Sequence, residues 1–181
     1  MIYYSDKTCS NDIISGKIAI GVIVKSDYRT VAMGQKRSAT MYWSKAYTDT
    51  ALSNHTYWED ARMDHKGQSN TSVIVAAHPD ENSSNNAAIY CNEYSTAGTS
   101  AGDWYLPAAG ELLTNVSENY DEIIPAITAL GWSWENLYLW SSSEYGRDIV
   151  WLINSHEFAM THGGKNSSRS VVCFLEVSNS L

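Results

Sequence analysis

The sequence predicts an α+β fold in which an antiparallel sheet is combined with a few short helices. Runs with the composition of strands lie near both ends of the chain, and segments with helical spacing lie between them. Strands, then helices, then strands is the order typical of α+β proteins, whereas regular alternation would predict a parallel sheet. At 181 residues, the chain is long enough for one domain that buries about two thirds of its surface. We therefore expect residues 1–181 to form a single domain.

The N-terminal part predicts a strand hairpin followed by irregular chain. Residues 18–24 are an apolar run, and residues 29–33 follow a short polar turn, which is the pattern of two buried strands. Residues 41–45 predict another short strand or an irregular packing segment. Residues 46–55 are rich in Thr, Asp, Ser and Asn and predict a surface loop. Residues 57–66 mix aromatic and charged residues, as a weak helix or a turn-rich segment does.

Two helices are predicted in the middle of the chain. The first begins with Ser69 as its cap and ends before Pro79, because the residue before a proline is pushed out of helical geometry. The second covers residues 87–94, with Asn86 or Asn85 as its cap. Its apolar residues recur at a spacing of three and four, which places them on one face.

A short strand at residues 104–106 leads into two further helices. The first of these covers residues 108–117. The second covers residues 120–130 but contains Pro125, so that it either begins at this proline or is kinked there. Gly131 is well placed to end it in the left-handed conformation that glycine favours.

The C-terminal part predicts three more strands, at residues 138–144, 149–155 and 171–177. They are rich in Trp, Val, Ile and Leu and are separated by segments of Gly, Asn, Asp and Ser. The segment at residues 146–148 predicts a tight turn. The segment at residues 163–168 superficially resembles a phosphate-binding loop but lacks the spacing, and we expect a hairpin turn there.

Alternation along residues 149–155 predicts which side chains face the core. Side chains alternate between the two faces of a strand, so Trp151 and Ile153 share one face. Leu152, Asn154 and His156 fall on the other face, which we expect to be exposed. The rigid scaffold is predicted to contain Trp104, Leu112, Trp140, Trp151, Ile153 and Val171.

Composition limits the classes of partner. The net charge is −8, and an acidic surface repels phosphate backbones, so we expect no nucleic-acid partner. The chain has no run of about 18 apolar residues, which predicts no membrane span. Residues 1–7 lack the basic and apolar regions of a signal peptide, so that display on a surface implies a removed signal or anchor, or a virion.

The three cysteines, Cys9, Cys91 and Cys173, have no spacing typical of a metal site. An odd number allows at most one disulfide within the chain. Cys173 lies in an apolar strand and Cys91 in a helix-like stretch, and we expect both to be buried thiols.

Catalytic patterns are missing from the sequence. None of the five histidines has the spacing of a metal-binding motif, although His156 and His162 with Asn154 make a metal site conceivable; exposed binding residues are favoured. Nucleophile elbows and phosphate loops are absent as well. We expect no catalytic residue, no metal and no cofactor. The helix-borne carboxylates are expected to be solvated: Glu111, Glu118, Asp121 and Glu122.

Three segments together carry a family resemblance. Residues 140–145 read WSSSEY, residues 104–107 read WYLP, and an acidic helix follows at residues 111–113. This combination resembles C-type-lectin-like domains from gut Bacteroidales and their phages, over residues 15–177. Many of those domains look like variable proteins of diversity-generating retroelements, whose C-terminal strands and loops are mutagenised to change ligand choice. Many members also end in VRPV or VRCV, whereas residues 171–174 here read VVCF and lack the arginine.

The resemblance implies a C-type-lectin-like fold with much irregular structure and a variable ligand-binding part at residues 138–177. The composition of the segment from residue 145 to residue 169, with Tyr, Gly, Asn, Ser and Arg, is typical of recognition surfaces. An ordinary solvent-facing hairpin is the alternative. The implied ligand-binding positions are Arg147, Asp148, Leu152, Asn154, His156, Met160, His162, Asn166 and Arg169.

We therefore expect a non-enzymatic domain for adhesion or receptor recognition, at the cell surface, outside the cell or on a virion. Its partner would be a protein or glycan on another cell. The alternative is a structural subunit of a surface fibre or pilus. The third possibility is an enzyme of the formylglycine-generating type, which the same fold carries; that activity needs cysteines near the C-terminus, where only Cys173 lies. The calcium-binding motifs of lectins are absent from the sequence.

Overall fold

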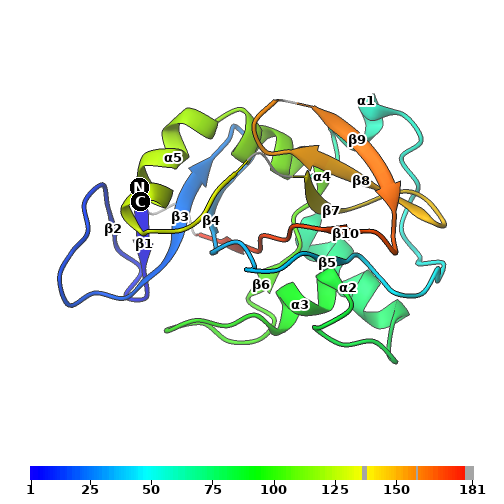
Figure 1. Cartoon of the computed structure of the whole chain (residues 1–181), viewed down its shortest axis with the longest axis horizontal. Coiled ribbons are helices and arrows are strands. Elements are labelled where there is room, and N and C mark those ends of the chain that lie inside the picture. Colours follow the sequence, from blue (N-terminus) through cyan, green and yellow to red (C-terminus); the bar gives the residue numbers. More distant parts are fainter. Residues whose placement is uncertain (136–137, 158, 178–181) are drawn as a thin grey trace.

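The computed structural model describes residues 1–135, 138–157 and 159–177. It contains antiparallel sheets and short helices joined by long irregular segments (Figure 1), which confirms the predicted α+β class. The predicted hairpin is present, since Val24 pairs with Val31 between β3 and β4. These two strands form the middle of a six-stranded sheet. Its strands, in spatial order, are β2 (Cys9–Ser10), β1 (Ile2–Tyr4), β3 (Ala19–Lys25), β4 (Thr30–Met33), β11 (Phe174–Glu176) and β6 (Trp104–Tyr105).

A second sheet contains β7 (Tyr138–Gly146), β8 (Ile149–Asn154) and β9 (Met160–Gly164). Two short strands, β5 (Met41–Tyr42) and β10 (Ser168–Arg169), pair beside it. Strand β9 was not predicted, because its sequence MTHGG has no run of strand-forming residues.

The predicted strand at residues 171–177 and the predicted hairpin turn at residues 163–168 are both partly wrong. Only Phe174–Glu176 forms a strand, since residues 171–173 are irregular. Gly163 and Gly164 belong to β9, and the turn after them leads to β10, which pairs with β5 and not with β9.

Short helical elements pack beside the sheets (Figure 1). Asn86 caps α3, because its Oδ1 accepts the N–H groups of Ala88 and Ile89, each at 3.0 Å. Helix α2 begins two residues before the predicted cap Ser69, which is exposed within its first turn. The elements are α1 (Trp58–Ala61), α2 (Gly67–Ala77), α3 (Ala87–Glu93), α4 (Ala109–Glu111), the π-helix η1 (Leu112–Ser117) and α5 (Tyr120–Ala129).

The predicted long helices differ in detail from the structure. The helix predicted at residues 108–117 is a short α-helix that continues as a π-helix. Pro125 lies inside α5, which begins at Tyr120 and not at the proline. Gly131 follows α5 with φ +67°, the left-handed conformation that was predicted to end it.

Strand β8 lies between two hydrophobic clusters. Trp151 and Ile153 pack with residues of the large sheet and α5, while Val150 and Leu152 pack with Trp140 and the residues around α2 and α3. The predicted exposed face of β8 is therefore wrong for Leu152 and for Asn154, each of which is 2% exposed. The six predicted scaffold residues are all buried: Trp104, Leu112, Trp140, Trp151, Ile153 and Val171.

A disulfide joins Cys91 of α3 to Cys173, which precedes β11. The prediction of two buried thiols is therefore wrong. The two Cα atoms lie 5.3 Å apart, which is a normal span for a disulfide. Cys9 is a free thiol at intermediate exposure. Among the described residues, no helix is long and apolar enough to cross a membrane.

Candidate functional site: a polar recess beside strand β7

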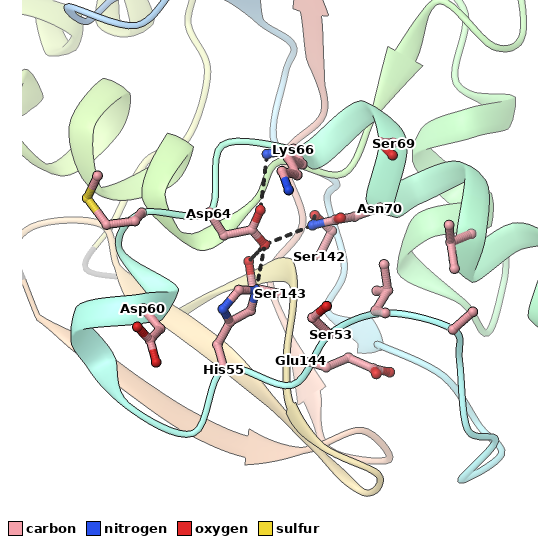
Figure 2. A pocket seen from close by; sticks show the side chains of 14 residues that line it. Ser53, His55, Asp60, Asp64, Lys66, Ser69, Asn70, Ser142, Ser143 and Glu144 are labelled. Carbon is pink, nitrogen blue, oxygen red and sulfur yellow. Dashed lines mark hydrogen bonds and ion pairs between the residues drawn. The ribbon is translucent and has the colours of Figure 1, made fainter.

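A recess of about 460 Å³ opens between helix α2, strand β7 and the segment at residues 51–66, which is irregular apart from α1 (Figure 2). Its walls carry mainly polar side chains from these three parts of the chain. This volume falls within the range of small-molecule sites. We call it the polar recess, and its lining includes Ser53, His55, Asp60, Asp64, Lys66, Ser69, Asn70, Ser142, Ser143 and Glu144.

The inner wall of the polar recess is a bulge in β7. Trp140 pairs with Leu152 and Glu144 pairs with Val150, so the three serines between them have no regular partner on β8. Ser141 Oγ donates instead to the carbonyl oxygen of Trp151 at 2.8 Å. The small side chains permit this distortion, which places Ser142 and Ser143 on the wall of the recess. The WSSSEY segment is therefore a structural centre of the site.

Asp64 is the centre of the polar network in Figure 2. Its Oδ2 accepts the hydroxyl of Ser143 at 2.6 Å and the amide of Asn70 at 2.9 Å, and His55 Nε2 lies 3.6 Å from the same oxygen. Its Oδ1 accepts the backbone N–H of Lys66 at 3.1 Å. Asp64 is buried, and a buried carboxylate is tolerated only with such donors. The network therefore holds His55 and Asn70 in fixed positions.

Serine, histidine and aspartate are present, but their order differs from that of a catalytic triad. Ser143 Oγ donates to the carboxylate of Asp64, and it accepts the backbone N–H of Ala109 at 2.9 Å. An activated serine donates to the imidazole, which in turn is oriented by the carboxylate. In this arrangement the carboxylate stands between serine and histidine, which is not the order of a catalytic triad.

Helix α4 fixes the backbone around Asp64. The N–H of Gly110 donates to the carbonyl oxygen of Asp64 at 3.0 Å. A Cβ atom at Gly110 would lie 2.7 Å from that oxygen, so only glycine permits the approach. The next residue, Glu111, is 0% exposed, which corrects the prediction of a solvated carboxylate. The other three predicted carboxylates are exposed: Glu118, Asp121 and Glu122.

Glu111 lies in a buried cluster behind α4. Its carboxylate accepts the N–H of Ala108 at 2.8 Å and lies 3.2 Å from the guanidinium of Arg29, and the hydroxyl of Tyr105 lies at 3.4 Å. Burial raises the pKa of Glu111 to about 7, although the Ala108 hydrogen bond and Arg29 act in the opposite direction. Burial also raises the pKa of Tyr105.

A buried ion pair closes the far side of the polar recess. Glu144 Oε1 lies 2.5 Å from Lys165 Nζ, and its Oε2 accepts the hydroxyl of Thr50 at 2.9 Å. Both charged side chains are buried, and Lys165 Nζ stands 4.6 Å from the ring centroid of Trp43. Lys165 lies in a turn within the predicted 163–168 segment, but its side chain is in the interior. The contact with Thr50 fastens the 46–55 segment to the sheet.

The other end of that segment is held by backbone groups of His55. Its N–H donates to the carbonyl oxygen of Glu144 at 2.8 Å, and its carbonyl oxygen accepts Trp151 Nε1 at 2.7 Å. The segment predicted as a surface loop is irregular, but these contacts pin it over β7 and β8.

The predicted ligand-binding positions do not form one group. Arg147 and Asp148 lie in the turn between β7 and β8, and the carbonyl oxygen of Asp148 accepts the N–H of Lys165, next to Asn166. His156 lies beyond the opposite end of β8, with its ring centroid 4.7 Å from that of Tyr120. These four positions are exposed, at two separate ends of the sheet.

The remaining predicted positions lie between these ends or in the interior. His162 is exposed on β9, and its ring contacts Tyr145 with centroids 4.6 Å apart. Met160 and Arg169 are half-buried. Leu152 is core, and Asn154 uses its Oδ1 to accept the N–H groups of His156 and Glu157.

The residues of the polar recess were not predicted as a site. Ser143 and Asp64 are 79 positions apart in sequence, and no periodic pattern links such residues. The three consecutive serines inside an apolar strand were the available signal, because small polar residues at that place favour a bulge. Among the described residues, no group of three or more His, Cys, Asp or Glu side chains is placed to hold a metal ion.

Comparison with known proteins gives a similarity at the level of fold. No protein-family model matches the sequence. No curated protein matches it either. A crystal structure of a fimbrial protein from Bacteroides ovatus ATCC 8483 is similar, with a TM-score of 0.65 and 14% sequence identity. The similarity covers 97% of this chain and 48% of the fimbrial protein, so the chain spans about half the length of that protein.

Proposed function

We propose that the chain is a domain of a surface fibre protein of the fimbrial kind. The observation that carries this proposal is the similarity of 97% of the chain to part of a fimbrial protein. The Cys91–Cys173 disulfide supports it, because such bonds form and persist in the oxidising environment outside the cytoplasm. A surface location follows from the same proposal.

The finer features of the proposal come from the sequence. We propose a C-type-lectin-like arrangement of the α+β fold, with the WSSSEY bulge as its centre. We also propose that the domain is not an enzyme. The arrangement around Ser143 supports this, since its hydroxyl donates to the Asp64 carboxylate and, among the described residues, makes no hydrogen bond to an imidazole.

The fibre proposal is tested by locating the protein on cells of its source. Antibodies raised against the purified chain would be used for immunogold electron microscopy and for immunoblots of sheared surface fibres. Labelling along fibres or at their tips, with the protein in the sheared fraction, is the expected result. A cytoplasmic enzyme on the same blots serves as the control for lysis. Protein that remains with the cytoplasmic fraction would contradict the proposal.

A retroelement-diversified recognition domain is the second candidate function. The exposure of Arg147, Asp148, His156, His162 and Asn166 favours it, because substitution at exposed positions costs little stability. Sequencing the neighbourhood of the gene tests it. A reverse-transcriptase gene and a template repeat that differs at adenines are expected. A neighbourhood with neither would remove this candidate and leave the fibre proposal intact.

A further inference from the structure

We infer that the polar recess binds a neutral, hydroxyl-rich ligand, such as one sugar residue of a glycan. The inference goes beyond a role in a fibre and is independent of it. It rests on the unused hydrogen-bonding groups of the recess, on the balance of its charges and on its rigidity.

One buried side chain presents an unused acceptor to the recess. Asn70 is 7% exposed and lines the cavity. Its amide nitrogen donates to Asp64 and faces Ser142 Oγ at 3.4 Å, which fixes the orientation of the amide because a carboxylate can only accept. Asn70 Oδ1 then accepts no hydrogen bond from the part of the chain that the structure describes. A ligand hydroxyl supplies the donor that this oxygen lacks.

Other groups around the recess both donate and accept. The hydroxyls of Ser53 and Ser69 are on exposed residues at its edge. His55 lines the recess and faces Asp64 through Nε2, and its Nδ1 has no hydrogen bond to the residues that the structure describes. A sugar hydroxyl is both donor and acceptor, and it matches such a mixed set better than a group that only accepts or only donates.

The charges of the recess favour a neutral ligand. Asp64 is surrounded by its own donors, and Glu144 is paired with Lys165, so neither carboxylate needs a cation from a ligand. The exposed Asp60 and Lys66 on the lining have opposite charges. An anion would meet the carboxylates, and a cation would reach the charge of Asp64 only by displacing the hydroxyl, amide and backbone donors that already occupy its oxygens.

Rigidity makes the recess suited to a small ligand. The network around Asp64 and the backbone contacts of His55 fix the wall before a ligand enters. A preorganised site loses little conformational freedom on binding, and a sugar residue offers few contacts to compensate for such a loss.

The test is a titration of the ¹⁵N-labelled chain, followed by its amide resonances. The probes are D-glucose, D-galactose, D-mannose, L-fucose, N-acetyl-D-glucosamine and N-acetyl-D-galactosamine. At least one of them is expected to cause saturable shifts at Ser69, Asn70 and Ser143. D-glucosamine and N-acetylneuraminic acid supply the cationic and anionic arms of the titration.

Two variants with the same substitution locate the binding. Ser69→Trp places a large ring at the edge of the recess, and Ser72→Trp places it on the same helix at an exposed position outside the lining. Ser69→Trp is expected to weaken sugar binding at least about tenfold while Ser72→Trp leaves it unchanged. The amide spectra also show whether each variant is folded.

Several results would overturn the assignment. These are the absence of saturable shifts for all six neutral sugars, shifts confined to residues away from the recess, or equal binding by Ser69→Trp and Ser72→Trp. Saturable binding of only the cationic or only the anionic probe would show that the ligand class is wrong. Each of these results leaves the fibre proposal untouched, because that proposal is judged by the location of the protein on cells.

Discussion

The β8–β9 hairpin and the irregular segment at residues 46–66 meet at strand β7 and contribute in opposite ways. The hairpin is regular and was predicted as the recognition surface, but β8 is buried on both faces. In the other segment, residues 46–55 were predicted as a surface loop and residues 57–66 as a weak helix or a turn-rich segment, yet it supplies His55 and Asp64 to the polar recess. The difference teaches that in this fold a regular strand provides rigidity, while a pinned irregular segment provides the chemistry.

The two regions are joined by specific contacts. Trp151 of β8 donates to the backbone of His55, and Lys165, which follows β9, pairs with Glu144 beside Thr50. The comparison therefore predicts that substitutions lower the free energy of unfolding strongly where the hairpin supports the segment at residues 46–66. It predicts that they change this free energy little where the hairpin faces solvent.

The largest effect is expected for Trp151→Ala, which should lower the free energy of unfolding by about 3–5 kcal/mol. The indole is packed in the core and donates to the His55 carbonyl, and alanine replaces neither interaction. Urea denaturation followed by tryptophan fluorescence measures the change. A loss below about 1 kcal/mol would show that β8 is not the support of this region.

Lys165→Met should cost about 3 kcal/mol, because it leaves the Glu144 carboxylate buried without its cation. The same denaturation experiment measures the loss. The double variant Glu144→Gln with Lys165→Met serves as the control and should recover more than about 1 kcal/mol, since no buried charge remains. Additive losses in the double variant would contradict a coupled pair.

Comparison of wild type with Glu111→Gln should reveal a contribution of Glu111 to the free energy of unfolding that changes with pH. The change is at most about 3 kcal/mol. The folded-state pKa of about 7 exceeds the ordinary value of 4.5, so the folded protein holds its proton to higher pH. The stability that the group contributes is complete below pH 4.5 and is lost as the pH rises through 7. Wild type should therefore lose stability relative to Glu111→Gln over that range.

Denaturation curves of the two proteins at matched pH values measure this difference. The exposed Glu118→Gln is the control and should differ from wild type by a constant amount. A constant difference for Glu111→Gln as well would mean that Arg29 keeps the buried carboxylate charged throughout.

The smallest effect is expected for His156→Ala, within about 0.5 kcal/mol, because the side chain is exposed and rests edge-on against the ring of Tyr120. Its melting temperature should match that of wild type. Unfolding of His156→Ala together with a stable Trp151→Ala would invert the assignment of faces along β8.

Local chemistry explains which features could be predicted from the sequence. Apolar runs predicted the β3–β4 hairpin, and residue type alone predicted the helix end at Gly131 and a cap at Asn86 or Asn85, of which the structure uses Asn86. The α+β class and the buried scaffold followed from the same short-range patterns. Each of these features depends on neighbours within a few positions.

The remaining features depend on contacts between distant segments. Leu152 was expected to face solvent because alternation describes one buried face, whereas β8 has a hydrophobic cluster on each side. Lys165 and Glu111 are charged residues of types that are usually exposed. They are buried here because each forms an ion pair with a residue from elsewhere in the chain. The recess depends on the contact of Ser143 with Asp64, which no short-range pattern encodes.

The Cys91–Cys173 bond also decides how the domain would carry mechanical tension. A pull applied before Cys91 and after Cys173 crosses the bridge directly, and the chain between the cysteines, which are separated by 82 positions, remains slack. About 280 Å of extended chain is thereby withheld from stretching. The β7 wall of the recess belongs to this shielded span, whereas His55 and Asp64 lie on the strained side. Tension along the chain therefore passes through the wall that carries His55 and Asp64 and bypasses the β7 wall.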